Sequence, residues 1–262
     1  MTPVRATLGI AVLLGACGVE ISNGGAARVG DAGAGDASTV DASLPIVGGD
    51  AGTDAAPVTT CGRRTLFLSF DGQTLQRGTS DATLNQASWM QIAQGTAPRY
   101  RANDAGRDAK ITAIVDGVRA QLLAFPITVV QTRPTSGEYM MIVLGGQPNQ
   151  VGSAFGVAVN TLDCDDSEHN DVAWVDDDVA PSQRVVNIVI GAIGLGLGLT
   201  AVNDPNDCMC SWGNNCNGIA AAPCQLGPMA TRDPNVPAGL RCAGAAAIQN
   251  EPATVRAAFC DP

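Results

Sequence analysis

Cysteines are the residues of this chain best suited to chemistry, and eight of the nine follow residue 60. Cys208-Met209-Cys210, Cys216 and Cys224 suggest either disulfides or a zinc or copper site, because thiolates and thioethers are soft metal ligands. The gaps of five and seven residues after Cys210 differ from the paired Cys-x2-Cys spacing of structural zinc sites. The N-terminal residues indicate that the chain is exported, and an even number of cysteines in an exported chain favours disulfides. We expect up to four disulfides of undetermined pairing, among Cys61, Cys164, Cys208, Cys210, Cys216, Cys224, Cys242 and Cys260.

The only histidine, His169, limits the other chemistry available to the chain. A single imidazole excludes zinc sites built on two or three histidines and leaves one candidate base for a Ser or Cys nucleophile. We expect His169 at the surface. The surrounding acidic stretch offers the oxygen ligands that calcium uses, but it lacks the 12-residue loop pattern. A solvated acidic loop is therefore favoured, with a structural calcium as the alternative, for Asp163, Asp165, Asp166, Glu168, Asp171, Asp176, Asp177 and Asp178.

The charge of the chain excludes one class of partner. There are 25 acidic residues against 15 basic ones, a formal net charge of −10. Nucleic-acid binding depends on neutralising phosphates with basic side chains, so no nucleic-acid partner is expected. Anionic membrane surfaces are disfavoured for the same reason.

The pattern of apolar residues predicts one α/β domain over residues 61–262. Residues 108–125 carry apolar side chains at three- and four-residue spacings, which indicates an amphipathic helix that Pro126 ends. Residues 184–199 are apolar on every side and indicate a buried helix, and a last helix is expected near 252–259. Strands are predicted at 65–70, 127–132, 139–144, 155–162 and 172–175.

The order of these elements and the residues from Gly191 to Met209 resemble the metzincin zinc metalloproteases, in particular the matrixin-like branch. The motif of that family reads His-Glu-x-Gly-His-x-x-Gly-Leu-x-His, followed eight residues later by the methionine of the Met-turn. In this chain Gly194, Gly198, Leu199 and Met209 match it. The resemblance implies a metzincin-like mixed sheet with two main helices, a Met-turn and a cysteine-rich C-terminal part.

The residues that carry the chemistry of that motif are absent. Gly191, Leu195 and Ala201 stand where the resemblance places the three histidine ligands, and Ala192 stands where it places the general-base glutamate. Without ligands there is no zinc-bound water of lowered pKa, and without the carboxylate nothing takes its proton. The resemblance therefore implies a catalytically inactive domain, and zinc is not an expected cofactor.

Two alternatives remain for the apolar segment that contains the degenerate motif. Residues 185–202 are almost free of polar side chains and are marginally long enough to span a membrane. Residues 185–190 followed by Gly196-x-Gly198-x-x-Ala201 also mimic the strand and glycine loop of a dinucleotide-binding fold.

The N-terminus predicts export and lipidation. Arg5 precedes an apolar run from Leu8 to Leu14, as in a secretory signal. Leu14-Gly15-Ala16-Cys17 is similar to the lipobox of bacterial lipoproteins, which implies cleavage after residue 16 and a lipid on Cys17. Residues 17–60 are rich in Gly, Ala and Asp and are expected to form a flexible tether. The residue after Cys17 is Gly18 and not the aspartate that retains some lipoproteins in the inner membrane, so the outer membrane is preferred.

These observations predict a lipid-anchored protein of the cell envelope whose domain binds protein or peptide and is not catalytic. The alternative is a hydrolase, such as a peptidase, whose active site is displaced or unrecognised. Expected partners are the membrane, through the N-terminal lipid, and a protein or peptide ligand.

Overall fold

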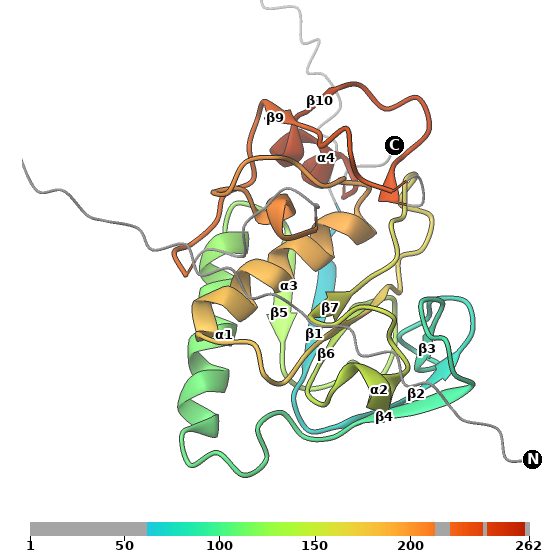
Figure 1. Ribbon diagram of the computed structural model, residues 1–262, viewed down its shortest axis with the longest axis vertical. Helices are drawn as coiled ribbons and strands as arrows, with labels where there is room; N and C mark the ends of the chain where they lie inside the picture. The colour runs from blue at the N-terminus through green and yellow to red at the C-terminus, as the bar shows by residue number, and fades with distance from the viewer. Residues whose placement is uncertain (1–61, 213–220, 238–239, 260–262) are drawn as a thin grey trace, which may run out of the picture. The chain divides into compact units, whose positions relative to one another are not determined.

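The computed structural model describes residues 62–212, 221–237 and 240–259. These residues form a mixed α/β structure with three β-sheets and four α-helices (Figure 1). The predicted α/β class is therefore confirmed. Cys17, Cys61, Cys216 and Cys260, with the predicted signal and the whole of the predicted tether, lie outside the described residues.

The largest sheet has five strands in the order β5-β1-β6-β8-β7. Strand β1 lies between β5 and β6 and pairs with both in parallel, and β6 pairs in parallel with β8. Strand β7 pairs antiparallel with β8 and forms one edge of the sheet. The strands are β1 (Arg64–Ser69), β5 (Ile127–Val130), β6 (Met140–Leu144), β7 (Ala158–Val159) and β8 (Val172–Val175).

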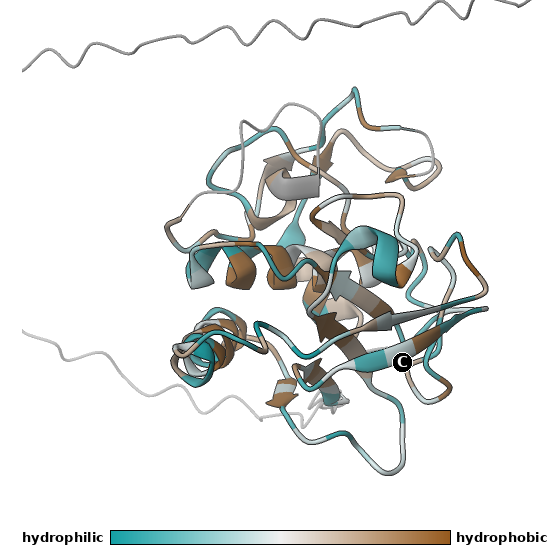
Figure 2. Cartoon of the chain, turned by 60° about the horizontal axis from the view of Figure 1, so that its bottom comes forward, coloured by the Kyte–Doolittle hydropathy of each residue, from teal (hydrophilic) through white to brown (hydrophobic). Residues whose placement is uncertain are grey.

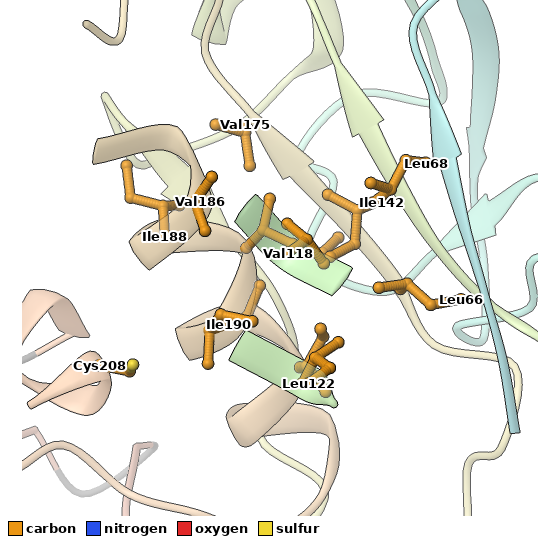
Figure 3. Close-up of a cluster of buried hydrophobic side chains, with 14 of the residues drawn as sticks. Leu66, Leu68, Val118, Leu122, Ile142, Val175, Val186, Ile188, Ile190 and Cys208 are labelled. Carbon is orange, nitrogen blue, oxygen red and sulfur yellow. The ribbon is translucent and has the colours of Figure 1, made fainter. Parts of the chain in front are cut away.

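Both faces of this sheet are buried, as the continuous apolar runs of β1, β6 and β8 predict. On one face Leu66, Leu68 and Ile142 pack under helices α1 (Arg107–Leu122) and α3 (Ser182–Gly196) (Figure 3). Helix α3 is buried from Val185 to its end, which explains why this part of its sequence is almost entirely apolar. Figure 2 shows apolar residues along the helices that pack on the sheet. The two helices approach closely at Gly117, where a β-carbon would come within 2.7 Å of Val186 Cγ2.

The opposite face of the main sheet is covered by elements that the sequence did not predict. A three-stranded sheet of β2 (Gln73–Arg77), β3 (Gln86–Ala87) and β4 (Gln94–Ala97), together with the short helix α2 (Pro148–Val151), packs there against Phe67, Met141 and Trp174. Strand β2 exposes its glutamines and arginine and buries Leu75. Because Leu75 is the one apolar residue of β2, this strand lacks the alternation of apolar and polar residues that predicts a strand.

The C-terminal part combines short elements with disulfides. After α3 come the 3-10 helix η1 (Cys208–Trp212), the pair β9 (Ala230–Thr231) and β10 (Ile248–Gln249), and helix α4 (Glu251–Ala257). Cys208 is bonded to Cys224 and Cys164 to Cys242, and Cys210 is also disulfide-bonded. The disulfide prediction is confirmed for these five cysteines, and the metal-thiolate alternative at Cys208 and Cys210 is wrong.

Several predicted boundaries shift in the structure. The strand predicted at 155–162 is reduced to the two residues of β7, because the exposed residues 154–157 bend before the ladder with β8 begins. Residues 185–190 are helical rather than extended, so the dinucleotide alternative is wrong. Helix α3 has 15 residues, and no helix in the described part of the chain is both long and apolar enough to cross a membrane.

Candidate functional site

Helix α3 ends in a turn that the degenerate motif predicts. Leu199 N–H donates to Gly194 O (2.8 Å) and Gly198 N–H donates to Leu195 O (3.1 Å), the two bonds of a Schellman motif. Gly198 has a φ of +80°, which a residue with a β-carbon adopts only with strain. The glycine therefore lets the chain reverse after α3 and lead to Ala201.

The four positions at which the resemblance would place the zinc ligands and the general base are all buried. Gly191, Ala192 and Leu195 lie on α3, and Ala201 lies just beyond the turn with 1% of its surface exposed. The backbone at Ala201 is also occupied, because Asp233 N–H donates to Ala201 O (2.9 Å). The space that ligands and substrate would need is filled by packed apolar side chains and backbone.

Met209 lies in η1, is fully buried, and packs against α3. A β-carbon at Gly194 would lie 2.5 Å from Met209 Sδ. Met209 N–H donates to Asp207 Oδ1 (2.8 Å), which fixes the start of η1. Two of the matched motif positions therefore meet in space, although no metal ligand accompanies them.

Asp171, at the start of β8, is the most unusual polar residue near α3. It is 1% exposed, and neither carboxyl oxygen has a hydrogen-bond partner among the described residues. It lies against Gly196, and with Asn160 and Ala192 it borders a void too small for a water molecule. Burial, followed by the negative charges of nearby acids, raises the Asp171 pKa to about 8. Its carboxyl group is therefore largely protonated at neutral pH.

The rest of the acidic stretch is more closely tied to the fold than a solvated loop would be. Asp163 accepts a hydrogen bond from Glu168 N–H (2.7 Å), and Asp166 forms an ion pair with Arg64. Burial raises the pKa of Asp163 and of Asp176. The expectation of a solvated loop is wrong for the three buried acids, Asp163, Asp171 and Asp176.

Two further features bear on the metal question. Among the described residues, no three acidic, histidine or cysteine side chains are grouped so that they could hold a metal ion. As expected, the His169 side chain is at the surface, 39% exposed, and its Nδ1 lies 2.9 Å from Glu138 Oε2.

A further buried carboxyl group belongs to Glu251, the first residue of α4. Glu251 is fully buried and close to Asp207, and burial together with the Asp207 charge raises the Glu251 pKa to about 8. Gln249 Nε2 donates to Glu251 Oε1 and Gly227 N–H donates to Oε2, both at 2.7 Å. The Glu251 oxygens are held by hydrogen bonds within the protein and shielded from solvent, so they do not offer a site for substrate. Glu251 and Asp207 instead join α4 to η1.

The outer edge of β7 is an exposed feature beside α3. Asn160 follows β7, and its Nδ2 donates to Ala192 O on α3 (2.8 Å). Asp176 N–H donates to Val157 O (2.9 Å), so in the antiparallel ladder the N–H and C=O of Ala158 point away from β8. Phe155 and Val157 beside it are 53% and 41% exposed.

The sequence predicts the buried helix of this region, but it does not predict the burial of Asp171 or the position of Ala158 at a sheet edge. Both properties depend on contacts between segments that are distant in sequence. The only signal for Asp171 was its place immediately before the apolar run of β8. Neither the comparison with protein-family models nor the comparison with curated proteins finds a match for this chain.

Proposed function

We propose that this chain is an exported lipoprotein whose domain is a catalytically inactive relative of the metzincin metalloproteases and binds an extended peptide segment of another protein. Two observations support the proposal: the chain turns at Gly198, as the motif implies, and Met209, which matches the Met-turn methionine of the motif, packs against Gly194. The ligand positions Gly191, Leu195 and Ala201 have no atom that could bind zinc. Binding rather than hydrolysis is then the function open to this frame.

The observation that carries the proposal is the outer edge of β7, against which no strand of the described residues pairs. An extended peptide adds to a sheet edge by pairing its backbone with the outward N–H and C=O groups of the edge strand. Ala158 supplies one such pair, and the exposed Phe155 and Val157 supply apolar contacts for alternate side chains of the peptide. The edge lies beside α3, so the bound peptide would cross the region of the degenerate motif.

Export to an oxidising compartment is supported by the cysteines. Disulfides persist outside the cytosol and are rare within it. Five described cysteines are disulfide-bonded, in addition to the signal-like and lipobox-like residues up to Cys17. The lipid on Cys17 would anchor the domain to the cell envelope, with the outer membrane preferred.

A proline substitution tests the peptide-binding edge. Ala158→Pro removes one outward N–H, and proline is tolerated on an edge strand where that group is not part of the ladder. The control Ala158→Ser keeps the N–H at the same position. The probes are fluorescein-labelled decapeptides rich in β-branched residues, measured by fluorescence anisotropy with the oxidised domain.

We expect saturable binding of one or more peptides by the wild type and Ala158→Ser, and binding at least about tenfold weaker by Ala158→Pro at unchanged melting temperature. Equal binding by both variants, or no binding by any peptide, would overturn the proposal. Cleavage of the peptides by the wild type would instead favour the hydrolase alternative.

A further inference from the structure

A cavity of about 200 Å³ lies between the segment after α3 and the C-terminal chain, in the part of the molecule around β9 and β10 (Figure 1). Thr200 and Ala201 form one wall, and residues between Arg232 and Ala247 form the others. Sites for drug-sized ligands are usually about 300–1,000 Å³, so this cavity has room for a group the size of one side chain.

Two arginines line this cavity without an acidic partner. Arg232 Nε donates to Gln249 Oε1 (2.9 Å) and Nη1 donates to Ala246 O, while Arg241 Nη2 donates to Pro234 O. Neither guanidinium forms an ion pair with an acidic residue in the described ranges. Each therefore keeps N–H donors that are not used within the described structure. In a chain with 25 acids and 15 bases, two such arginines at one cavity are an unexpected arrangement.

The surroundings of the cavity increase its attraction for an anion. Arg232 is partly buried, and desolvation lowers its pKa more than the nearby Glu251 carboxyl group raises it, so a negative group beside Arg232 would relieve an unfavourable burial of charge. Asp233 is the acidic residue in the lining, and its Oδ1 already accepts a hydrogen bond from Asn235 N–H (2.8 Å). With two arginines and one aspartate, the lining carries a net positive charge.

The remaining lining is small and apolar. Val236 is buried, Leu240 is half-buried, and three consecutive alanines at 245–247 complete the wall. This part of the surface suits a short aliphatic chain.

We propose that this cavity binds a carboxylate group carried on a short aliphatic chain, with Arg232 and Arg241 as its donors. A guanidinium presents paired N–H groups whose geometry matches a carboxylate, which makes arginine the suitable residue for this anion. The carboxylate can come from a free dicarboxylic acid or from an acidic side chain of a polypeptide. The site uses none of the residues of the β7 edge, so it stands or falls independently of the peptide-binding proposal.

The test uses glutarate as the free acid and its neutral isostere glutaramide as the matched ligand. A capped pentapeptide with a central glutamate and its glutamine counterpart represent the polypeptide source. Binding is followed by nuclear magnetic resonance of the oxidised domain at constant ionic strength. Arg241→Gln removes one donor, and Arg77→Gln, on the exposed part of β2, makes the same charge change far from the lining residues in sequence and outside the cavity.

We expect glutarate or the glutamate peptide to shift the amides of Thr200 and residues 245–247 saturably, while the two neutral ligands do not. Arg241→Gln should weaken this binding about fivefold or more, and Arg77→Gln less than about twofold. Tighter binding of the peptide than of glutarate identifies a polypeptide source, and the reverse identifies a free acid. Equal response to charged and neutral ligands, or equal loss in both variants, would overturn the proposal even if peptides bind at β7.

Discussion

The thioether of Met209 lies directly against the backbone of Gly194, so that a β-carbon at Gly194 would come within 2.5 Å of the sulfur. Met209 is fully buried, and Leu199 Cδ1 would lie only 3.2 Å from the same β-carbon. Even one added methyl group therefore requires the buried Met209 side chain, or η1 together with it, to move away from α3. This contact depends on the identity of both residues and couples the turn after α3 to the disulfide-bonded segment that follows.

Gly194→Ala should lower the free energy of unfolding by about 1–3 kcal/mol, the usual cost of overpacking a core. Urea unfolding of the oxidised domain measures this change. Gly156→Ala is the control, because no heavy atom lies within 4 Å of the β-carbon it would add. In a double-mutant cycle with Met209→Ala, the costs should not add, since truncation of Met209 makes room for the new methyl. Strict additivity would contradict the contact.

Asp171 makes stability depend on pH. Its pKa is about 8 in the folded protein against an ordinary value of 3.8, so the folded state holds a proton that the unfolded state releases. The stabilising contribution is complete below about pH 4 and is lost as pH rises toward 8, with a slope of up to about 1.4 kcal/mol per pH unit. Glu251, whose folded pKa is also about 8, acts in the same direction.

Asp171→Asn should therefore flatten the decline of unfolding free energy between pH 5 and pH 8, because the amide carries no charge at either end. Urea midpoints measured at half-unit pH intervals give the profile. Asp108→Asn, at a side chain that is 97% exposed, controls for the loss of one negative charge. A wild-type profile that is level across this range, or identical in Asp171→Asn, would rule out the buried neutral acid.

The burial of α3 can be predicted from the sequence alone, whereas the burial of Asp171 cannot. Helix α3 was predictable because its buried residues are apolar with the exception of Asn187, a property that local sequence displays. Asp171 was expected in a solvated loop, since its burial results from the packing of β8 under α3 and not from its neighbours in sequence. The same holds for Arg232 and Arg241, which only the folded C-terminal segments bring to one cavity.

All eight cysteines after residue 60 should be oxidised. The mass of the unreduced domain should be lower by about eight protons than that of the reduced form, as expected for an exported protein. Peptide mapping should recover Cys164 linked to Cys242 and Cys208 linked to Cys224. Recovery of four or more free thiols would refute the prediction.

The lipid anchor is tested at Cys17. Cells fed radiolabelled palmitate should label the wild-type protein, and Cys17→Ala should abolish the label and leave an uncleaved or soluble product. The control Cys164→Ala removes a cysteine of the domain and should leave labelling unchanged. Persistence of the label in Cys17→Ala would end the lipoprotein assignment.

The resemblance to the metzincin motif can be tested by introducing the residues that carry the chemistry of that motif. If α3 and the turn at Gly198 keep the metzincin frame, Gly191→His, Ala192→Glu, Leu195→His and Ala201→His together should create a zinc site. The i, i+4 spacing on α3 and the left-handed Gly198 would already orient the ligands. Zinc affinity is measured by competition with a chromophoric chelator, and cobalt substitution reports the ligand geometry.

We expect a gain in zinc affinity and little peptidase activity, because groups that orient the ligands are absent and the positions are buried. Each new polar side chain would cost about 1–3 kcal/mol if it stays unpaired, so stability is measured with and without zinc. The control keeps Ala201 and lacks the third ligand, and it should bind zinc more weakly. The pair Gly191→His and Leu195→His serves if the full variant does not fold. A folded variant with no more zinc affinity than the wild type would show that these residues do not keep the metzincin geometry.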